Sequence, residues 1–107
     1  MAALTIQDAS NGANVTLAAA SGGGDTVAGG SRASGWDIGV ALLVQNGGAG
    51  AITVSIDGVA QTALPNTAGA NLAVYPLYAT QYGKVRAITY TGVTSVTVAA
   101  VRTSPAP

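Results

Sequence analysis

Residues 52–57 read Ile52-Thr53-Val54-Ser55-Ile56-Asp57, and this stretch alternates apolar and polar side chains without a break. Successive side chains of a β-strand point to opposite faces, so strict alternation is typical of a strand with one buried and one exposed face. We therefore expect the two isoleucines and Val54 in a hydrophobic core, with Thr53 and Ser55 outward. The Asp57-Gly58 pair that follows indicates a tight turn.

Further strands are predicted on both sides of this one. Residues 94–101 form a second strand, with Val96, Val98 and Ala100 on one face, and residues 84–90 form a third. Residues 38–45 are apolar on both faces, which favours a central strand. Residues 72–77 form a further strand that Pro76 ends or confines to a sheet edge. Apolar residues recur nowhere with the spacing of a helix.

These patterns predict an all-β fold: a single antiparallel β-sandwich, jelly-roll or immunoglobulin-like, of about seven or eight strands. Long Gly-rich loops are expected at 18–36 and 58–71. The whole chain, 1–107, is expected to form one domain, with 1–17 as an N-terminal arm or hairpin and 103–107 as a flexible tail. Three hairpins are predicted, joining 4–6 to 15–17, 38–45 to the strand after Gly50, and 84–90 to 94–101.

Charged residues make up 7% of the chain, against about 25% in ordinary soluble domains. Four Asp balance four Lys and Arg, and His, Cys, Glu and Phe are absent. Without His or Cys there is no triad, thiol nucleophile or ordinary zinc or haem ligand set. We therefore expect no enzyme activity, no cofactor and no metal. The neutral charge argues against a nucleic-acid partner, and the longest apolar run, 38–44, is too short to span a membrane.

The aromatic residues are the candidate contact residues. Trp36 ends the first Gly-rich stretch, and three tyrosines lie close together in the sequence: Tyr75, Tyr78 and Tyr82. Aromatic and Arg side chains dominate interface energetics, so these four and Arg32 are the candidate capsid or inter-subunit contacts. Two alternatives remain: the rings plug the ends of the sandwich, or they form a sugar-binding platform.

The order of several short motifs resembles a known family. Gly24-Asp25-Thr26 precedes Leu42-Leu43-Val44-Gln45-Asn46-Gly47-Gly48 and Ile52-Thr53-Val54; Tyr75-Pro76, Tyr82-Gly83-Lys84-Val85 and the run from Val93 to Arg102 follow. The chain resembles, over roughly residues 22–102, the small β-sandwich head decoration proteins of tailed bacteriophages, especially actinobacterial phages. These are also called cement or minor capsid proteins.

The resemblance implies a structural protein that binds the outside of the major capsid lattice and stabilises it. Its partner would be the major capsid protein. At a three-fold or quasi-three-fold position of the lattice, closed symmetry favours a homotrimer, so we also expect the chain to bind itself. It would be made in the host cytoplasm and end on the outer surface of the virion. Two alternative functions stay open: a tail, fibre or adhesin-type module that contacts host carbohydrate, and a head–tail joining protein.

Overall fold

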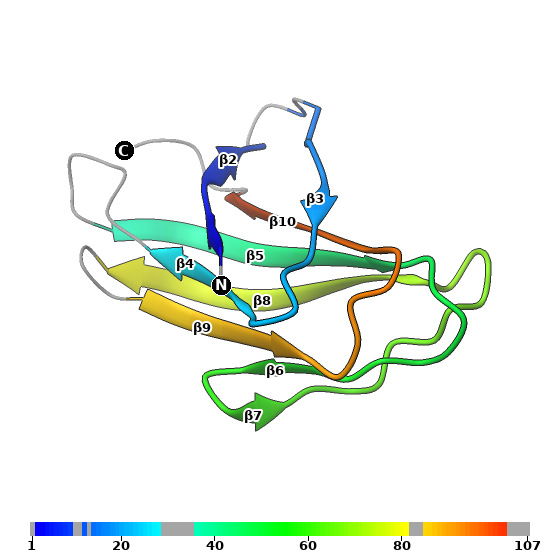
Figure 1. Ribbon diagram of the computed structural model, residues 1–107. Helices are drawn as coiled ribbons and strands as arrows, with labels where there is room; N and C mark the ends of the chain where they lie inside the picture. Colours follow the sequence, from blue (N-terminus) through cyan, green and yellow to red (C-terminus); the bar gives the residue numbers. More distant parts are fainter. Residues whose placement is uncertain (1, 10–11, 13, 29–35, 82–84, 103–107) are drawn as a thin grey trace.

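The computed structural model describes residues 2–9, 12, 14–28, 36–81 and 85–102, and all regular elements in this part are β-strands (Figure 1). They form two sheets of five strands each, stacked as a sandwich, which confirms the all-β prediction. The first sheet contains, in spatial order, β1 (Ala2–Leu4), β4 (Asp25–Ala28), β9 (Val85–Tyr90), β6 (Val54–Ile56) and β7 (Val59–Ala60).

The second sheet is built around two long strands. β5 (Trp36–Asn46) has 11 residues and β8 (Leu72–Gln81) has 10, and they pair antiparallel. On the other side of β5 lies β10 (Val96–Arg102). The far side of β10 pairs with β2 (Ile6–Asp8) and with β3 (Ala18–Ala19), so β8 is the edge strand at the opposite margin.

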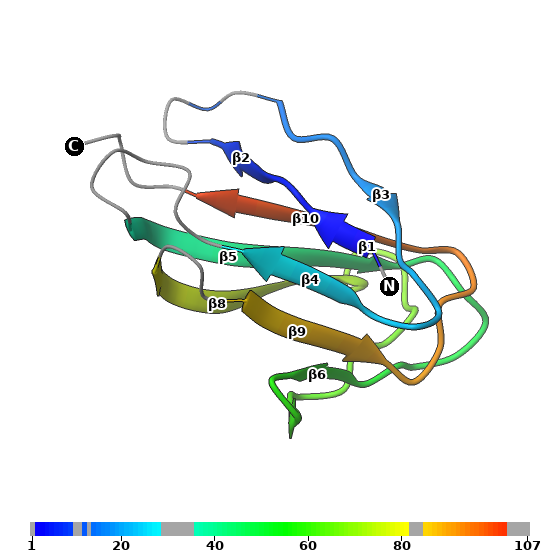
Figure 2. The ribbon, with the colours of Figure 1, turned by 60° about the vertical axis from the view of Figure 1, so that its left-hand side comes forward.

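The N-terminal arm, residues 2–8, belongs to both sheets. β1 pairs parallel with β4 in the first sheet, the chain crosses at Thr5, and β2 pairs parallel with β10 in the second (Figure 2). The sheets are therefore mixed, whereas the sequence pattern predicted antiparallel pairing throughout. A parallel neighbour needs no hairpin turn, so local turn signals could not reveal it. Ile6 is buried in the core, so the arm closes one side of the sandwich.

The core lies between the sheets and follows the predicted alternation. Ile52, Val54 and Ile56 are buried, and so are Val96 and Val98. The polar residues between them are half-buried or exposed, as predicted. β6 is shorter than the alternating run, because Ile52 makes only an isolated bridge to another chain segment.

The predicted pairings between consecutive strands are wrong. β5 and β6 lie in different sheets, and so do β9 and β10. Residues 15–17 are joined to β2 through the Gln7 amide, which donates to the Thr16 carbonyl at 2.8 Å and accepts from its N–H at 2.9 Å. The sequence could not separate the two arrangements for two reasons. A short Gly-rich connection can form a hairpin or can carry the chain from one sheet to the other. In both cases the alternating strands place an apolar face towards the core.

The Asp57-Gly58 turn is confirmed. It joins β6 to β7 through two residues whose φ angles are 51° and 82°. Two consecutive positive φ angles define the type I′ turn, which matches the twist of a two-residue hairpin and favours Asp-Gly.

The predicted long Gly-rich loops are not confirmed. The 18–36 stretch contains β3, a short turn at 20–24, β4 and the first residue of β5, and residues 29–35 lie outside the described residues. The 58–71 stretch contains β7 and the buried residue Leu64. The Leu64 N–H donates to the Ile52 carbonyl at 2.8 Å, and the Ile52 N–H donates to the Leu64 carbonyl at 3.0 Å. The predicted tail, 103–107, also lies outside the described residues.

Candidate interaction surface

Two ion pairs at the surface neutralise four charged side chains. Arg86 of β9 pairs through Nε with Asp57 of the β6–β7 turn, and its Nη1 donates to the Leu77 carbonyl of β8 at 2.9 Å. The other oxygen of Asp57 accepts the Ala87 N–H at 2.9 Å. Arg86 thereby links the first sheet to β8 of the second sheet.

The second ion pair lies on the N-terminal arm. Arg102 Nη2, at the end of β10, lies 3.6 Å from Asp8 Oδ2, at the end of β2. The two residues are opposite each other in the parallel ladder. This pair holds the arm against the strand that it extends.

Asp25 is a buried carboxylate inside the first layer. Its Oδ2 accepts the Tyr90 hydroxyl at 2.7 Å and the Ser21 N–H at 3.2 Å. Burial first, then this hydrogen bond and the negative charge of Asp25, raise the pKa of Tyr90 far above its usual value. Asp25 Oδ1 has no hydrogen-bond partner among the described residues. The group connects the β3–β4 turn to β9.

The outer faces of both sheets carry no charged residue among the side chains that the structure describes. The first sheet presents small residues such as Thr26, Ala87 and Thr89, together with Val85, which is 55% exposed. The second sheet is more apolar at its β8 margin, where Leu72 is 54% exposed, Val74 is 59% exposed and Pro76 is exposed as well. We call these three residues, with Ala41 and Leu43 of the neighbouring strand β5, the β8 face.

A hollow of about 310 Å³ lies beside the β8 face, between β8 and the β6–β7 hairpin. Its apolar wall contains Pro76 and Val59, and its polar wall contains the Arg86–Asp57 ion pair. It therefore opens on the side of the sandwich opposite to the N-terminal arm.

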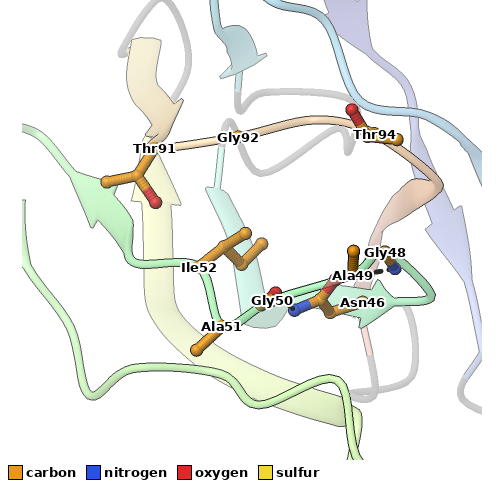
Figure 3. A pocket seen from close by; sticks show the side chains of 9 residues that line it. All are labelled: Asn46, Gly48, Ala49, Gly50, Ala51, Ile52, Thr91, Gly92 and Thr94. Carbon is orange, nitrogen blue, oxygen red and sulfur yellow. Dashed lines mark hydrogen bonds between the residues drawn. The ribbon is translucent and has the colours of Figure 1, made fainter.

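A second hollow, of about 290 Å³, lies at the Gly-rich end of β5 (Figure 3). Its lining comes from residues 46–52 and from the 91–94 segment, and the side chains are small apart from Asn46 and Ile52. Asn46 holds the loop by accepting the Gly48 N–H at 3.0 Å and donating to the Gly50 carbonyl at 2.9 Å. No group in this lining titrates near neutral pH, so the hollow offers no acid–base chemistry.

Of the five candidate contact residues, the structure describes the side chain of one. Tyr75 is only 7% exposed and packs in the core, where burial raises the pKa of its hydroxyl. Its ring therefore fills the sandwich and is not an exposed contact. Trp36 begins β5 and Tyr78 lies in β8 opposite Val40, but their side chains lie outside the description. Arg32 and Tyr82 lie outside the described residues.

The sequence reasoning missed Leu72 and Val74 as surface residues. The sequence did contain a signal for this exposure. Residues 72–77, Leu72-Ala73-Val74-Tyr75-Pro76-Leu77, are apolar on both faces of the strand, and the proline indicates an edge strand. An edge strand that is apolar on both faces must leave one apolar face towards solvent unless something covers it.

Comparison with protein-family models, with curated proteins and with solved structures found no match to this chain. In the described part of the chain, no three His, Cys, Asp or Glu residues gather where they could hold a metal ion. The same part contains no helix long and apolar enough to cross a membrane.

Proposed function

We propose that this chain is a non-enzymatic structural protein of a tailed-bacteriophage head: a decoration or cement protein that binds the outside of the major capsid lattice and stabilises it. The observation that carries the proposal is the uncharged, apolar β8 face, next to which Arg86 is neutralised by its ion pair with Asp57. Such a surface suits contact with another protein, because nucleic acids are bound mainly through clustered Lys and Arg.

The size of the exposed apolar surface favours weak contacts made many times. Leu72 and Val74 are each exposed by little more than half. Together they contribute about 200 Å², whereas a stable pairwise complex buries about 800 Å² on each partner. A repetitive shell overcomes this weakness when a trimer engages several sites together, because linked sites raise the effective concentration.

The motif order from Gly24 to Arg102 also supports this function, since it resembles decoration proteins. In the proposal, the protein assembles as a homotrimer on the outer surface of the virion, with the major capsid protein as its partner. In addition to the β8 face, the proposed contacts are Arg32, Trp36, Tyr78 and Tyr82.

The test is binding to phage heads that lack this protein. Purified protein is mixed with such heads, the particles are separated by sedimentation, and the bound copies are counted on a gel. We expect hundreds of copies per head, and a higher temperature for heat-induced DNA release than in bare heads. Purified tails serve as the control.

Three results would contradict the proposal. Absence of binding to heads would end it. Binding to tails alone, in a handful of copies, would favour a tail or joining role. Binding to host cells that soluble oligosaccharides compete away would favour a carbohydrate-binding module.

A further inference from the structure

The outer edge of β8 carries backbone groups that no strand in the described part of the chain uses. The Asn46 N–H donates to the Asn71 carbonyl at 2.8 Å, so these opposed residues form a hydrogen-bonded pair. Hydrogen-bonded and non-hydrogen-bonded pairs alternate along an antiparallel ladder. Leu72 and Val74 therefore belong to the non-hydrogen-bonded kind, and their N–H and C=O groups point away from β5.

Pro76 supports this assignment independently. It lies opposite Ala41, at the same parity as Leu72 and Val74. Proline has no N–H and is found in sheets where the missing donor would face away from the neighbouring strand. The open edge therefore offers donors at residues 72 and 74 and a carbonyl at each of the three positions.

Nothing in the sequence of β8 protects this edge by charge. Exposed edge strands usually carry Lys or Glu, which discourage pairing with another chain. Residues 71–81 contain no charged residue, and the two residues that present edge donors also expose apolar side chains. The N-terminal arm closes the opposite side of the sandwich by pairing with both sheets. The β8 side has no such covering segment among the described strands, so it can accept an added strand.

The hollow between β8 and the β6–β7 hairpin lies where a side chain of an added strand would point. Its volume of about 310 Å³ exceeds that of any single side chain, and Val59 and Pro76 give it an apolar wall. Beyond them the Arg86–Asp57 pair closes the hollow with groups that already bind each other. An apolar side chain fits this environment better than a charged one.

We propose that β8 binds an extended, uncharged segment of the shell protein by strand addition, with one apolar side chain of that segment in the hollow. The inference rests on the proposed function, from which it takes the identity of the partner. A second copy is the alternative occupant. In antiparallel self-pairing centred on Val74, each Leu72 carbonyl would face a Pro76, which has no N–H to donate; pairing centred on Ala73 avoids this mismatch, and the oligomeric state in solution decides between the occupants.

Two substitutions at Val74 separate the backbone contact from the side-chain contact. Val74→Pro keeps an apolar side chain and removes the edge N–H, and no ladder bond to β5 is lost because that N–H points outward. Val74→Thr keeps the N–H and the shape of the side chain but replaces a methyl group by a hydroxyl. Leu72→Pro repeats the first change at the other edge donor, and thermal unfolding verifies that each variant is folded.

The readout is the binding affinity for heads that lack the protein. We expect Val74→Pro to weaken it at least about tenfold, the equivalent of one hydrogen bond, and Val74→Thr about threefold. Equal binding by wild type and by both proline variants would overturn strand addition and leave the decoration function intact. A larger loss for Val74→Thr than for Val74→Pro would also overturn it.

Two further outcomes complete the test. If the wild type does not bind heads, the proposed function and the inference both fail. If the wild type forms a dimer in solution that Val74→Pro dissociates, the occupant of the edge is a second copy and the inference is wrong. Amide hydrogen exchange gives the direct signature: Val74 should exchange quickly in the free protein and slowly on the head.

Discussion

At the scale of single residues, the buried amide of Asn46 connects three segments that are distant in the sequence. It accepts from Gly48, donates to the carbonyls of Gly50 and Leu64, and its backbone exchanges hydrogen bonds with Asn71. Removal of the amide would take this partner from the Gly48 N–H and the Gly50 carbonyl, and would leave the Leu64 carbonyl with the Ile52 N–H alone. One polar side chain thus fixes the connections at one end of the sandwich.

We expect Asn46→Ala to lower the free energy of unfolding by about 2–4 kcal/mol, because the Gly48 N–H and the Gly50 carbonyl lose the amide as a partner and the Leu64 carbonyl loses one of its two bonds. The matched control is Asn66→Ala, since Asn66 makes one exposed bond, to the Gly48 carbonyl, and should lose less than about 1 kcal/mol. Urea unfolding measures both. Equal losses would mean that the Asn46 network contributes no more than a surface bond.

The alternating stretch gives a second prediction. Val54 is fully buried, so Val54→Ala should cost about 1–4 kcal/mol through lost burial and the cavity left behind. Its neighbour Thr53 is half-buried on the outer face, and Thr53→Ala should cost less. A larger loss at Thr53 in chemical denaturation would reverse the assignment of the two faces.

The raised pKa of Tyr90 predicts a loss of stability in alkali. Below the ordinary tyrosine pKa of about 10, the protonated ring is present in both states and its contribution is complete. Above that value the unfolded state releases its proton first, so stability falls as the pH rises towards the folded pKa. Tyr90→Phe should lower stability at pH 7, where Asp25 loses a donor, and make the decline from pH 9 to 11 shallower. An unchanged decline in thermal unfolding would contradict this.

At the scale of elements, the alternation from Ile52 to Ile56 was enough to predict a strand and its buried face, and Asp57-Gly58 was enough to predict its turn. Strand partners could not be predicted in the same way. A connection such as Gly47-Gly48 permits a hairpin or a crossing between layers, and the choice depends on contacts far away in the sequence. The N-terminal arm shows the same limit, because parallel pairing leaves no local signal.

The candidate site was predictable only in part, for a similar physical reason. Aromatic residues bury large areas wherever they pack, so their type alone does not separate an interface from a core. Tyr75 proved to be a core residue. The exposure of Leu72 and Val74 depends on β8 being an edge strand, which in turn depends on the pairing that the sequence left open.

The β3–β4 turn supplies a prediction that distinguishes two neighbouring glycines. A Cβ on Gly24 would lie 2.6 Å from the Ile88 carbonyl, and the φ of Gly24 is +95°. A Cβ on Gly22 would meet only Val93, at 3.9 Å. Gly24→Ala should therefore destabilise the protein by about 2 kcal/mol or more, and Gly22→Ala by less than about 1 kcal/mol. Similar thermal midpoints for the two variants would contradict the close approach of this turn to β9.

At the scale of the whole molecule, charge is scarce, and four of the eight charged residues form the two described ion pairs. The formal net charge is zero, and the described surface places two arginines in ion pairs with aspartates. Salt screens attraction between separate charges but has little effect on the burial of apolar surface. Assembly through the β8 face should therefore tolerate salt.

We expect the number of copies bound per head to be nearly the same in 0.05 M and 0.5 M salt, an ionic-strength range over which exposed charges become strongly screened. Sedimentation of heads with bound protein at each salt concentration measures it. A collapse of binding at the higher concentration would leave the decoration function standing but would show that charge, and not the apolar β8 face, anchors the protein.

The parallel pairing of β2 with β10 also determines how the molecule resists a pull. β2 lies near one end of the chain and β10 near the other, and they run in the same direction with Ile6 opposite Ala100 and Asp8 opposite Arg102. Force applied between the chain ends draws these strands past each other lengthwise. Their hydrogen bonds then share the load and must break together, whereas a hairpin pulled at its open end would unzip one bond at a time. The arm that closes the sandwich is thus also its mechanical clamp.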